Sequence, residues 1–286
     1  MILDRRGALG ALAGLGAGIA AGSIDAARAS ATSINAAPLV LLSSRLTQGG
    51  WAIGQAGRGL TLDLAGAPVP TAPDGRFLIA FDRDAGPAAL LTGKLPSGYS
   101  ATLPLAIAPR AWRIERIDAP MRPPSLPSAD YQRIRAAEVA RTAAARAIVT
   151  GAQGWRQAMI RPAAGRFSGR FGSQRVYQGQ PGSYHTGLDI AAPTGTPILC
   201  PADGVVILAA AAPFTLEGKL LMVDHGMGLS SAFLHCSAHL VNQGDAVRQG
   251  QAIARVGMTG RATGPHLHWG LRWHDARLDP LLFLPA

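Results

Sequence analysis

The chain has 286 residues, of which 48% are hydrophobic and 15% charged, a composition that excludes an intrinsically disordered protein and allows one or two packed domains. Its 35 glycines and 21 prolines favour short strands joined by turns over a helical protein. The net charge of +10 favours contact with anionic surfaces such as lipids or cell-wall polymers. The basic residues are scattered and no nucleic-acid-binding motif accompanies them, which argues against a nucleic-acid-binding protein.

Residues 1–29 are predicted to be an export signal. Arg5-Arg6 precede a weakly apolar stretch of Gly and Ala, and a small-x-small cleavage site follows at residues 27–29. The paired arginines are typical of a twin-arginine signal, although general secretion stays open. The stretch is too weakly apolar for a stable membrane anchor, and no other segment could cross a bilayer. We therefore expect an exported mature chain without a transmembrane span.

Residues 38–118 are predicted to form a small β-sandwich accessory domain. Short apolar runs alternate there with turn signals such as Pro73-Asp74-Gly75. The region holds no histidine and no clustered carboxylates, so a spacer or binding module is expected. Whether it docks an envelope protein partner or covers a groove stays open. The strand candidates are WAIGQ, LTLDL, FLIAF, AALLTGKL and YSATLPLAI.

Residues 119–151 are predicted to be a connector between two β-rich regions. Residues 119–127 form a proline-rich linker, and Ser128 can cap a helix that continues to residue 149, with Gly151 as the stop signal. The segment is rich in Ala and Arg and has few large apolar residues. We expect a solvated connector helix.

All seven histidines lie after residue 160, where strand patterns return. His266 and His268 would project from the same face of a strand, while Leu267, Trp269 and Leu271 would face a core. An isolated pair of this kind is commonly two surface histidines at a strand end, so a metal site needs further ligands. The histidines are His185, His225, His235, His239, His266, His268 and His274.

The stretch HTGLD supplies further ligand candidates, because His185 and Asp189 share a face in an extended chain. Together with one histidine of the later pair they give two imidazoles and one carboxylate. Three such ligands with a position left for water are typical of a catalytic zinc site, whereas a structural site normally has four protein ligands. Additional imidazoles nearby could orient the water, move protons or stabilise an oxyanion.

The two cysteines, Cys200 and Cys236, lack the CxxC spacing of a thiolate metal site. A disulfide is compatible with export, and two buried free thiols are equally compatible with the apolar runs around them. Both alternatives stay open.

The motifs HTGLD, DHGMGLS and AFLHCSAHLVNQGDAVRQGQAIARVGMTGRATGPHLHWG together resemble the M23 family of metallopeptidases, of the LytM and lysostaphin type. The resemblance covers residues 160–283, and the motifs occur in the family's order. The preceding region also resembles the β-rich domain of bacterial envelope members. The resemblance implies a mainly β protein: a small β-sandwich, a connector helix and a C-terminal antiparallel β LytM-type peptidase domain.

Carried over residue by residue, the resemblance implies that His185, Asp189 and His268 bind one Zn²⁺ per chain. It implies that His266 is a catalytic histidine that does not bind the metal. His235 and His239 both lie in sequences similar to the family's remaining catalytic motif. The family's distance to the glycine that opens GDAVRQGQ selects His235.

Two departures from the family pattern lie beside His235. Phe233 stands where tyrosine is usual, which removes a hydroxyl and would weaken substrate contact, and Cys236 stands where leucine is usual. We expect structural roles for His225 and His239 and an exposed His274.

The resemblance implies a zinc endopeptidase that hydrolyses peptide cross-links of peptidoglycan in the periplasm or envelope of a Gram-negative bacterium. The substrate it favours is the D-amino-acid cross-link between stem peptides rather than a glycine bridge. One alternative is a non-catalytic LytM-like activator of other wall hydrolases, but such proteins have lost zinc ligands. A biotinyl or lipoyl carrier domain would need a lysine at a tight turn, and neither Lys94 nor Lys219 occupies one.

Overall fold

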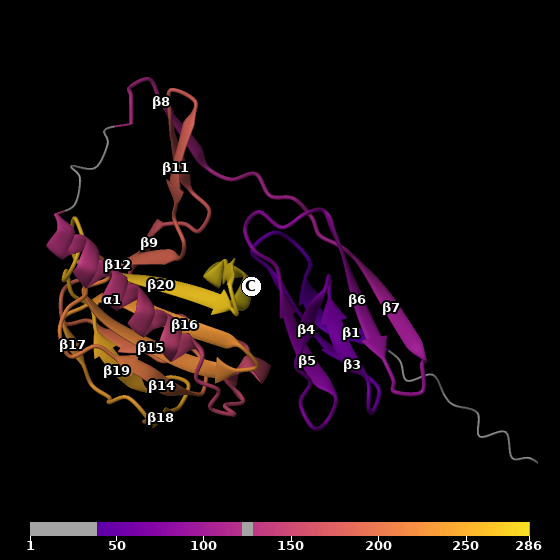
Figure 1. The fold of residues 1–286 in the computed structure, drawn as a ribbon. Coiled ribbons are helices and arrows are strands. Elements are labelled where there is room, and N and C mark those ends of the chain that lie inside the picture. Colours follow the sequence, from indigo (N-terminus) through magenta and orange to yellow (C-terminus); the bar gives the residue numbers. More distant parts are fainter. Residues whose placement is uncertain (1–38, 122–127, 286) are drawn as a thin grey trace, which may run out of the picture. The chain divides into compact units, whose positions relative to one another are not determined.

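The computed structural model describes residues 39–121 and 128–285, which form a mainly β structure with one α-helix (Figure 1). The predicted export signal and most of the predicted linker lie outside these residues. In the part described, no helix is both long and apolar enough to span a membrane.

The predicted sandwich region holds a three-stranded and a four-stranded antiparallel sheet. Leu62 and Leu91 of one sheet and Phe77 and Ile79 of the other belong to the same buried cluster. The five strand candidates are confirmed within one residue at each end, while β1 and β4 were not predicted. The strands are β1 (Val40–Arg45), β2 (Trp51–Gln55) and β5 (Arg76–Ala80), and β3 (Thr61–Leu64), β4 (Ala67–Val69), β6 (Ala88–Lys94) and β7 (Ser100–Ala106).

A further strand near the end of the predicted sandwich region, β8 (Ile114–Ile117), pairs elsewhere. It lies parallel to β10 in the sheet order β11-β10-β8 rather than beside a sandwich strand. Its partners are β10 (Gln174–Tyr177) and β11 (Gln180–Tyr184).

The C-terminal region is built on an eight-stranded antiparallel sheet, with β21 paired to β20 beside the order β18-β14-β15-β16-β20-β12-β9. Its strands are β9 (Arg166–Gly169), β12 (Leu188–Ala191), β14 (Gly204–Ala209), β15 (Lys219–Gly226), β16 (Leu229–Cys236), β18 (Ala246–Val247), β20 (His266–Trp273) and β21 (Ala276–Leu278). A small sheet joins β13 (Pro197–Leu199), β17 (Ala238–His239) and β19 (Ala252–Arg255). Two 3₁₀ turns complete the region, Gly154–Arg156 and Pro280–Phe283.

Buried and partly exposed side chains alternate along β20, as its sequence predicts. Leu267, Trp269 and Leu271 are fully buried, whereas His266 and His268 lie on the opposite, partly open face. Burial of three large apolar side chains on one face fixes the register of the strand, because a slip by one residue would expose them and bury the histidines.

The α-helix of the described residues, α1 (Ala129–Arg146), begins where the sequence predicts, and the Ser128 hydroxyl accepts a hydrogen bond from the Tyr131 amide. It ends at Arg146, so the predicted extension to residue 149 is wrong. The β-branched residues that follow are poor helix formers. In addition, Thr150 donates from both its amide and its hydroxyl to the Asp224 carboxylate, which draws the chain away from the helix axis.

The prediction of a solvated connector was also wrong for one side of α1. Glu138 and Ala145 are buried, and Ala145 packs into a cluster with apolar side chains of β14 and β15. Figure 1 shows α1 crossing the strands of the large sheet. Small alanine side chains allow this close approach, so the lack of large apolar residues did not indicate full exposure.

Candidate metal centre and active-site cavity

Strand register brings the candidate ligands together. Asp189 of β12 is directly opposite His268 of β20, and such neighbours have Cβ atoms about 5 Å apart. His185 lies three residues before β12, and the chain between them passes close to β20. A Cβ atom at Gly187 would lie only 2.5 Å from the Trp269 carbonyl oxygen and 2.7 Å from His268 Nε2. The glycine in HTGLD therefore allows His185 to approach the other two residues.

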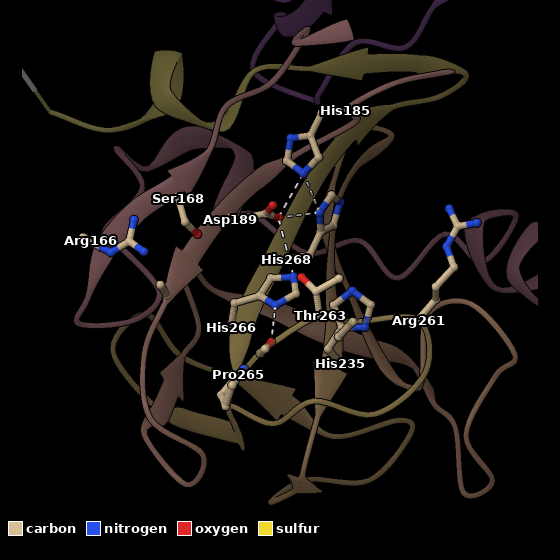
Figure 2. A pocket seen from close by; sticks show the side chains of 13 residues that line it. Arg166, Ser168, His185, Asp189, His235, Arg261, Thr263, Pro265, His266 and His268 are labelled. Carbon is tan, nitrogen blue, oxygen red and sulfur yellow. Dashed lines mark hydrogen bonds and ion pairs between the residues drawn. The ribbon is translucent and has the colours of Figure 1, made fainter. Parts of the chain in front are cut away.

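The three side chains place one atom each around a common point (Figure 2). Asp189 Oδ1 lies 2.8 Å from His268 Nδ1 and 3.0 Å from His185 Nε2, and the two nitrogens are 3.1 Å apart. Donor atoms that share a tetrahedral zinc ion at about 2.0–2.1 Å lie roughly 3.3 Å from one another. Among the described residues this trio is the only group of three or more with metal-ligand spacing. Its chemistry and its spacing fit zinc.

The electrostatics favour the deprotonated form of Asp189, which is the form that binds a metal. Burial tends to raise the pKa of Asp189, but hydrogen bonds with His185 and His268 outweigh it and hold this pKa well below its ordinary value. Burial lowers the pKa of His268, which keeps its ring neutral. Burial also tends to lower the pKa of His185, but the hydrogen bond and the charge of Asp189 outweigh it and raise this pKa. A metal cation and a proton would thus compete at His185.

Two further imidazoles face the same cavity, each with a fixed tautomer. His235 Nδ1 donates to the Thr259 carbonyl at 2.8 Å, and His266 Nδ1 donates to the Gly264 carbonyl at 2.8 Å. Since a carbonyl only accepts, Nε2 of each ring is the acceptor nitrogen when the ring is neutral. His266 Nε2 lies 4.0 Å from Asp189 Oδ1, and the ring centroids of His235 and His266 are 4.8 Å apart.

The backbone at His235 is unusual. Its φ of 63° lies in the left-handed region that non-glycine residues rarely adopt, and its amide donates to the Glu217 carbonyl. This kink at the end of β16 turns the imidazole into the cavity. Residues held in such conformations are concentrated at functional sites.

The five residues line one cavity of about 490 Å³. Other residues of its wall were not singled out from the sequence, among them Arg166, Ser168, Arg261 and Thr263 (Figure 2). Arg166 and Ser168 alternate on β9, which pairs with β12. Their i, i+2 spacing indicates that both side chains lie on the same face of a strand. That this face borders the cavity follows only from the pairing of β9 with β12, two segments about twenty residues apart in the sequence.

The remaining candidates lie outside this cavity. His225 is fully buried and bonded to the Asp203 carbonyl and to Ser231, His239 lies on β17, and His274 is exposed. Phe233 is also fully buried, so the expectation that its missing hydroxyl weakens substrate contact was wrong: this side chain belongs to the core.

Cys200 and Cys236 are buried free thiols. The Sγ atom of Cys200 donates to the Ala202 carbonyl and that of Cys236 to the Phe233 carbonyl. Of the two alternatives left open by the sequence, the structure has the free thiols.

Comparison with known proteins relates the segment that carries this site to a peptidase family. Residues 183–280 match the sequence profile of peptidase family M23. The peptidoglycan DD-endopeptidase ShyA of Vibrio cholerae is 42% identical over 87 residues, which are 30% of this chain and 20% of that protein. The DD-carboxypeptidase/endopeptidase Mpg of Neisseria meningitidis is 41% identical over 97 residues, 34% of this chain and 22% of that protein. The matched segments thus span about a fifth of these relatives.

A solved structure of an M23 peptidase from Pseudomonas aeruginosa resembles a larger part of the chain. The two superimpose with a TM-score of 0.65 at 28% sequence identity, over 84% of this chain and 95% of that one. The likeness therefore extends well beyond the segment that matches the family profile.

Proposed function

Since residues 183–280 are a domain of peptidase family M23, we propose that the chain is a zinc-dependent endopeptidase that hydrolyses peptide cross-links of peptidoglycan. The observation that supports this most directly is the gathering of Asp189 Oδ1, His268 Nδ1 and His185 Nε2 within 3.1 Å of one another in an open cavity. These three residues would hold the zinc ion. When bound, zinc supplies Lewis acidity, which activates water at neutral pH and polarises a carbonyl group.

The protein's own contribution is proton transfer and orientation of the attacking water. Nε2 of His266, at 4.0 Å from the proposed ligand Asp189, is placed to accept a proton from the attacking water and to pass it to the leaving amine. Nε2 of His235, the acceptor nitrogen of its neutral ring, faces the cavity from the neighbouring strand and is placed to accept a hydrogen bond from the attacking water and so to orient it. The Thr259 and Gly264 carbonyls hold these rings in the required tautomer.

For the substrate, we propose the D-amino-acid cross-link between stem peptides. The names of the relatives from Vibrio and Neisseria describe DD-endopeptidases, and these organisms are Gram-negative bacteria. The same relatives, together with the predicted export signal, support a location in the cell envelope.

Digestion of purified sacculi tests this function, with released muropeptides identified by mass spectrometry. The zinc-loaded chain should convert cross-linked dimers into monomers, a chelator should abolish the conversion, and added zinc should restore it. Asp189→Ala should be inactive. If the folded, zinc-loaded chain leaves every cross-link intact, the proposal is wrong, and the alternative of a non-catalytic activator gains support.

A further inference from the structure

A second cavity adjoins the proposed catalytic one. It has a volume of about 940 Å³, and His268 lines both cavities. One side of its wall is formed by α1. The lining residues of α1 share one helical face, because they are spaced four, three and four apart: Arg135, Val139, Thr142 and Arg146. On the other side its wall is the face of β15, β16 and β20 that carries Met222, Ala232 and Arg272. A peptide bound at the metal centre could therefore extend along this face and under the helix.

Three arginines meet in this cavity. Arg272 of β20 is directly opposite Arg277 of β21, and Arg146 reaches them from the last turn of α1. Like charges placed directly opposite one another on neighbouring strands destabilise a sheet. In the part of the chain that the structure describes, no ion pair neutralises any of the three, and the buried Nε of Arg146 has no hydrogen-bond partner.

Partial burial makes the repulsion among these arginines more unfavourable. Burial, followed by the charges of Arg272 and Arg277, lowers the pKa of Arg146 to about 10, which leaves it charged at neutral pH. Burial and the charge of Arg277 lower the pKa of Arg272 in the same way. Three guanidinium groups are thus partly removed from water and repel one another.

The acidic residues of the same wall have other partners. Glu217 accepts two hydrogen bonds from Arg135, and Asp224 accepts from Thr150 and from the Gly226 amide. Asp275, the third carboxylate, is exposed at the turn between β20 and β21. The cluster therefore keeps a surplus of positive charge that a bound anion would neutralise.

We propose that Arg146, Arg272 and Arg277 form a subsite that binds a free carboxylate of an acidic peptide whose backbone runs from the metal centre along β20. This rests on the proposed peptidase function. Arginine suits the role because its planar guanidinium donates two parallel hydrogen bonds to a carboxylate. Arg272 lies four positions after His268 on the same face of β20, a distance of about 13 Å between their Cα atoms. The subsite would therefore select peptides by a carboxylate on the order of four residues from the bond that is cut.

Binding of two matched peptides tests the subsite apart from catalysis. The probes are an N-acetylated alanine pentapeptide with D-alanine at its first two positions, as the free acid and as the C-terminal carboxamide, so that the terminal carboxylate belongs to the fourth residue after the bond between the two D-alanines. Calorimetry would be performed on the full chain carrying His266→Ala, which prevents cleavage during the measurement. The free acid should bind roughly 10-fold or more tightly than the amide, as expected for hydrogen bonds between charged groups.

Substitutions locate the preference. Arg272→Gln and Arg146→Gln, each added to the His266→Ala chain, should reduce the preference for the free acid to less than about 3-fold and leave binding of the amide unchanged. Neither should lower the melting temperature, because each removes a repelling charge. Arg133→Gln is the matched control, since Arg133 is an exposed arginine of α1 outside the cavity, and the preference should persist there.

The outcomes separate the two proposals. Equal binding of acid and amide, or a preference that survives both Arg272→Gln and Arg146→Gln, overturns the subsite. If the carboxylate preference depends on these arginines but the wild-type chain leaves sacculi intact, the peptidase proposal fails while the subsite stands.

Discussion

His235 and His266 each bond one ring nitrogen to a backbone carbonyl and turn the other toward the cavity. We expect His235→Ala and His266→Ala to keep near-normal zinc content, because neither ring belongs to the ligand trio. Turnover should fall by about 10²–10⁴, as is typical for loss of a positioned group that accepts a proton or a hydrogen bond from the reacting water. Zinc content and muropeptide release would be measured in parallel.

His239→Ala is the control for these variants, because its sequence imitates the same motif while its side chain lies outside the cavity. It should retain activity. An inactive His239→Ala beside a fully active His235→Ala would show that the spacing argument selected the wrong histidine.

The two cysteines should be inert in the folded protein. Burial raises the pKa of both Cys200 and Cys236 to about 12, and the thiolate is the reactive form. Iodoacetamide should therefore label neither residue in the native state and both after denaturation, as measured by mass spectrometry. Rapid native labelling, or a mass showing that the thiols are oxidised to a disulfide, would contradict this. The double variant Cys200→Ala, Cys236→Ala should keep its zinc.

Strand alternation and short-range spacing connect His185 and Asp189, and likewise His266 and His268, whereas His235 was reached only through the family resemblance. The arginine cluster was not accessible in this way. Arg272 and Arg277 become neighbours only through the β20–β21 pairing, and Arg146 reaches them only because α1 ends at that residue and packs on the sheet. Nothing in the local sequence of Arg146 indicates this placement.

At the level of elements, Glu138 attaches α1 to the loop before β15. Its carboxylate accepts from the Thr215 amide at 2.6 Å, from the Thr215 hydroxyl at 2.7 Å and from Arg135 at 3.0 Å. Glu138→Gln should lower the free energy of unfolding by about 1–3 kcal/mol, because a buried acceptor of charged hydrogen bonds is replaced by an amide. Denaturant titration followed by tryptophan fluorescence measures the change.

The same contact should depend on pH. Burial tends to raise the pKa of Glu138, but hydrogen bonds from Thr215 and Arg135 outweigh it, so this pKa lies below its ordinary value. A carboxyl with a lowered folded-state pKa stabilises the protein above its unfolded-state pKa, and this stabilisation is lost as pH falls through the folded-state value. The difference between wild type and Glu138→Gln should thus be largest near neutral pH and shrink in acid. A difference that grows in acid would contradict this role.

The helix also shows how far patterns predict an element. Its start follows from one local hydrogen bond at Ser128, which the sequence makes visible. Its end depends on Asp224, which lies 74 positions after Thr150 in the sequence. The Asp224 carboxylate accepts hydrogen bonds from both the amide and the hydroxyl of Thr150. The strand β4 escaped prediction for a related reason: it is defined by its pairing with β3 rather than by a strong apolar run. The strand β1, by contrast, begins in the apolar run LVLL of residues 39–42 and was accessible from the sequence.

For the molecule as a whole, the described residues, 39–121 and 128–285, form one compact unit. Buried Asp279 pairs with Arg110 at 2.8 Å, and the Trp51 indole donates to the Leu282 carbonyl. We expect circular dichroism and tryptophan fluorescence to report one coincident unfolding transition. Arg110→Ala should lower its midpoint, because it leaves the buried Asp279 carboxylate without its cation. Two resolved transitions in the wild-type chain would contradict this coupling.

The central claim is that His185, Asp189 and His268 form a zinc centre, and metal content tests it most directly. Atomic emission on the purified chain should find about one zinc per molecule, the ratio expected for a single centre of two imidazoles, one carboxylate and an open position. His185→Ala, Asp189→Ala and His268→Ala should each lose most of it, while His274→Ala, which changes an exposed histidine outside the proposed catalytic cavity, should keep it. Full zinc occupancy in all three ligand variants would contradict the claim.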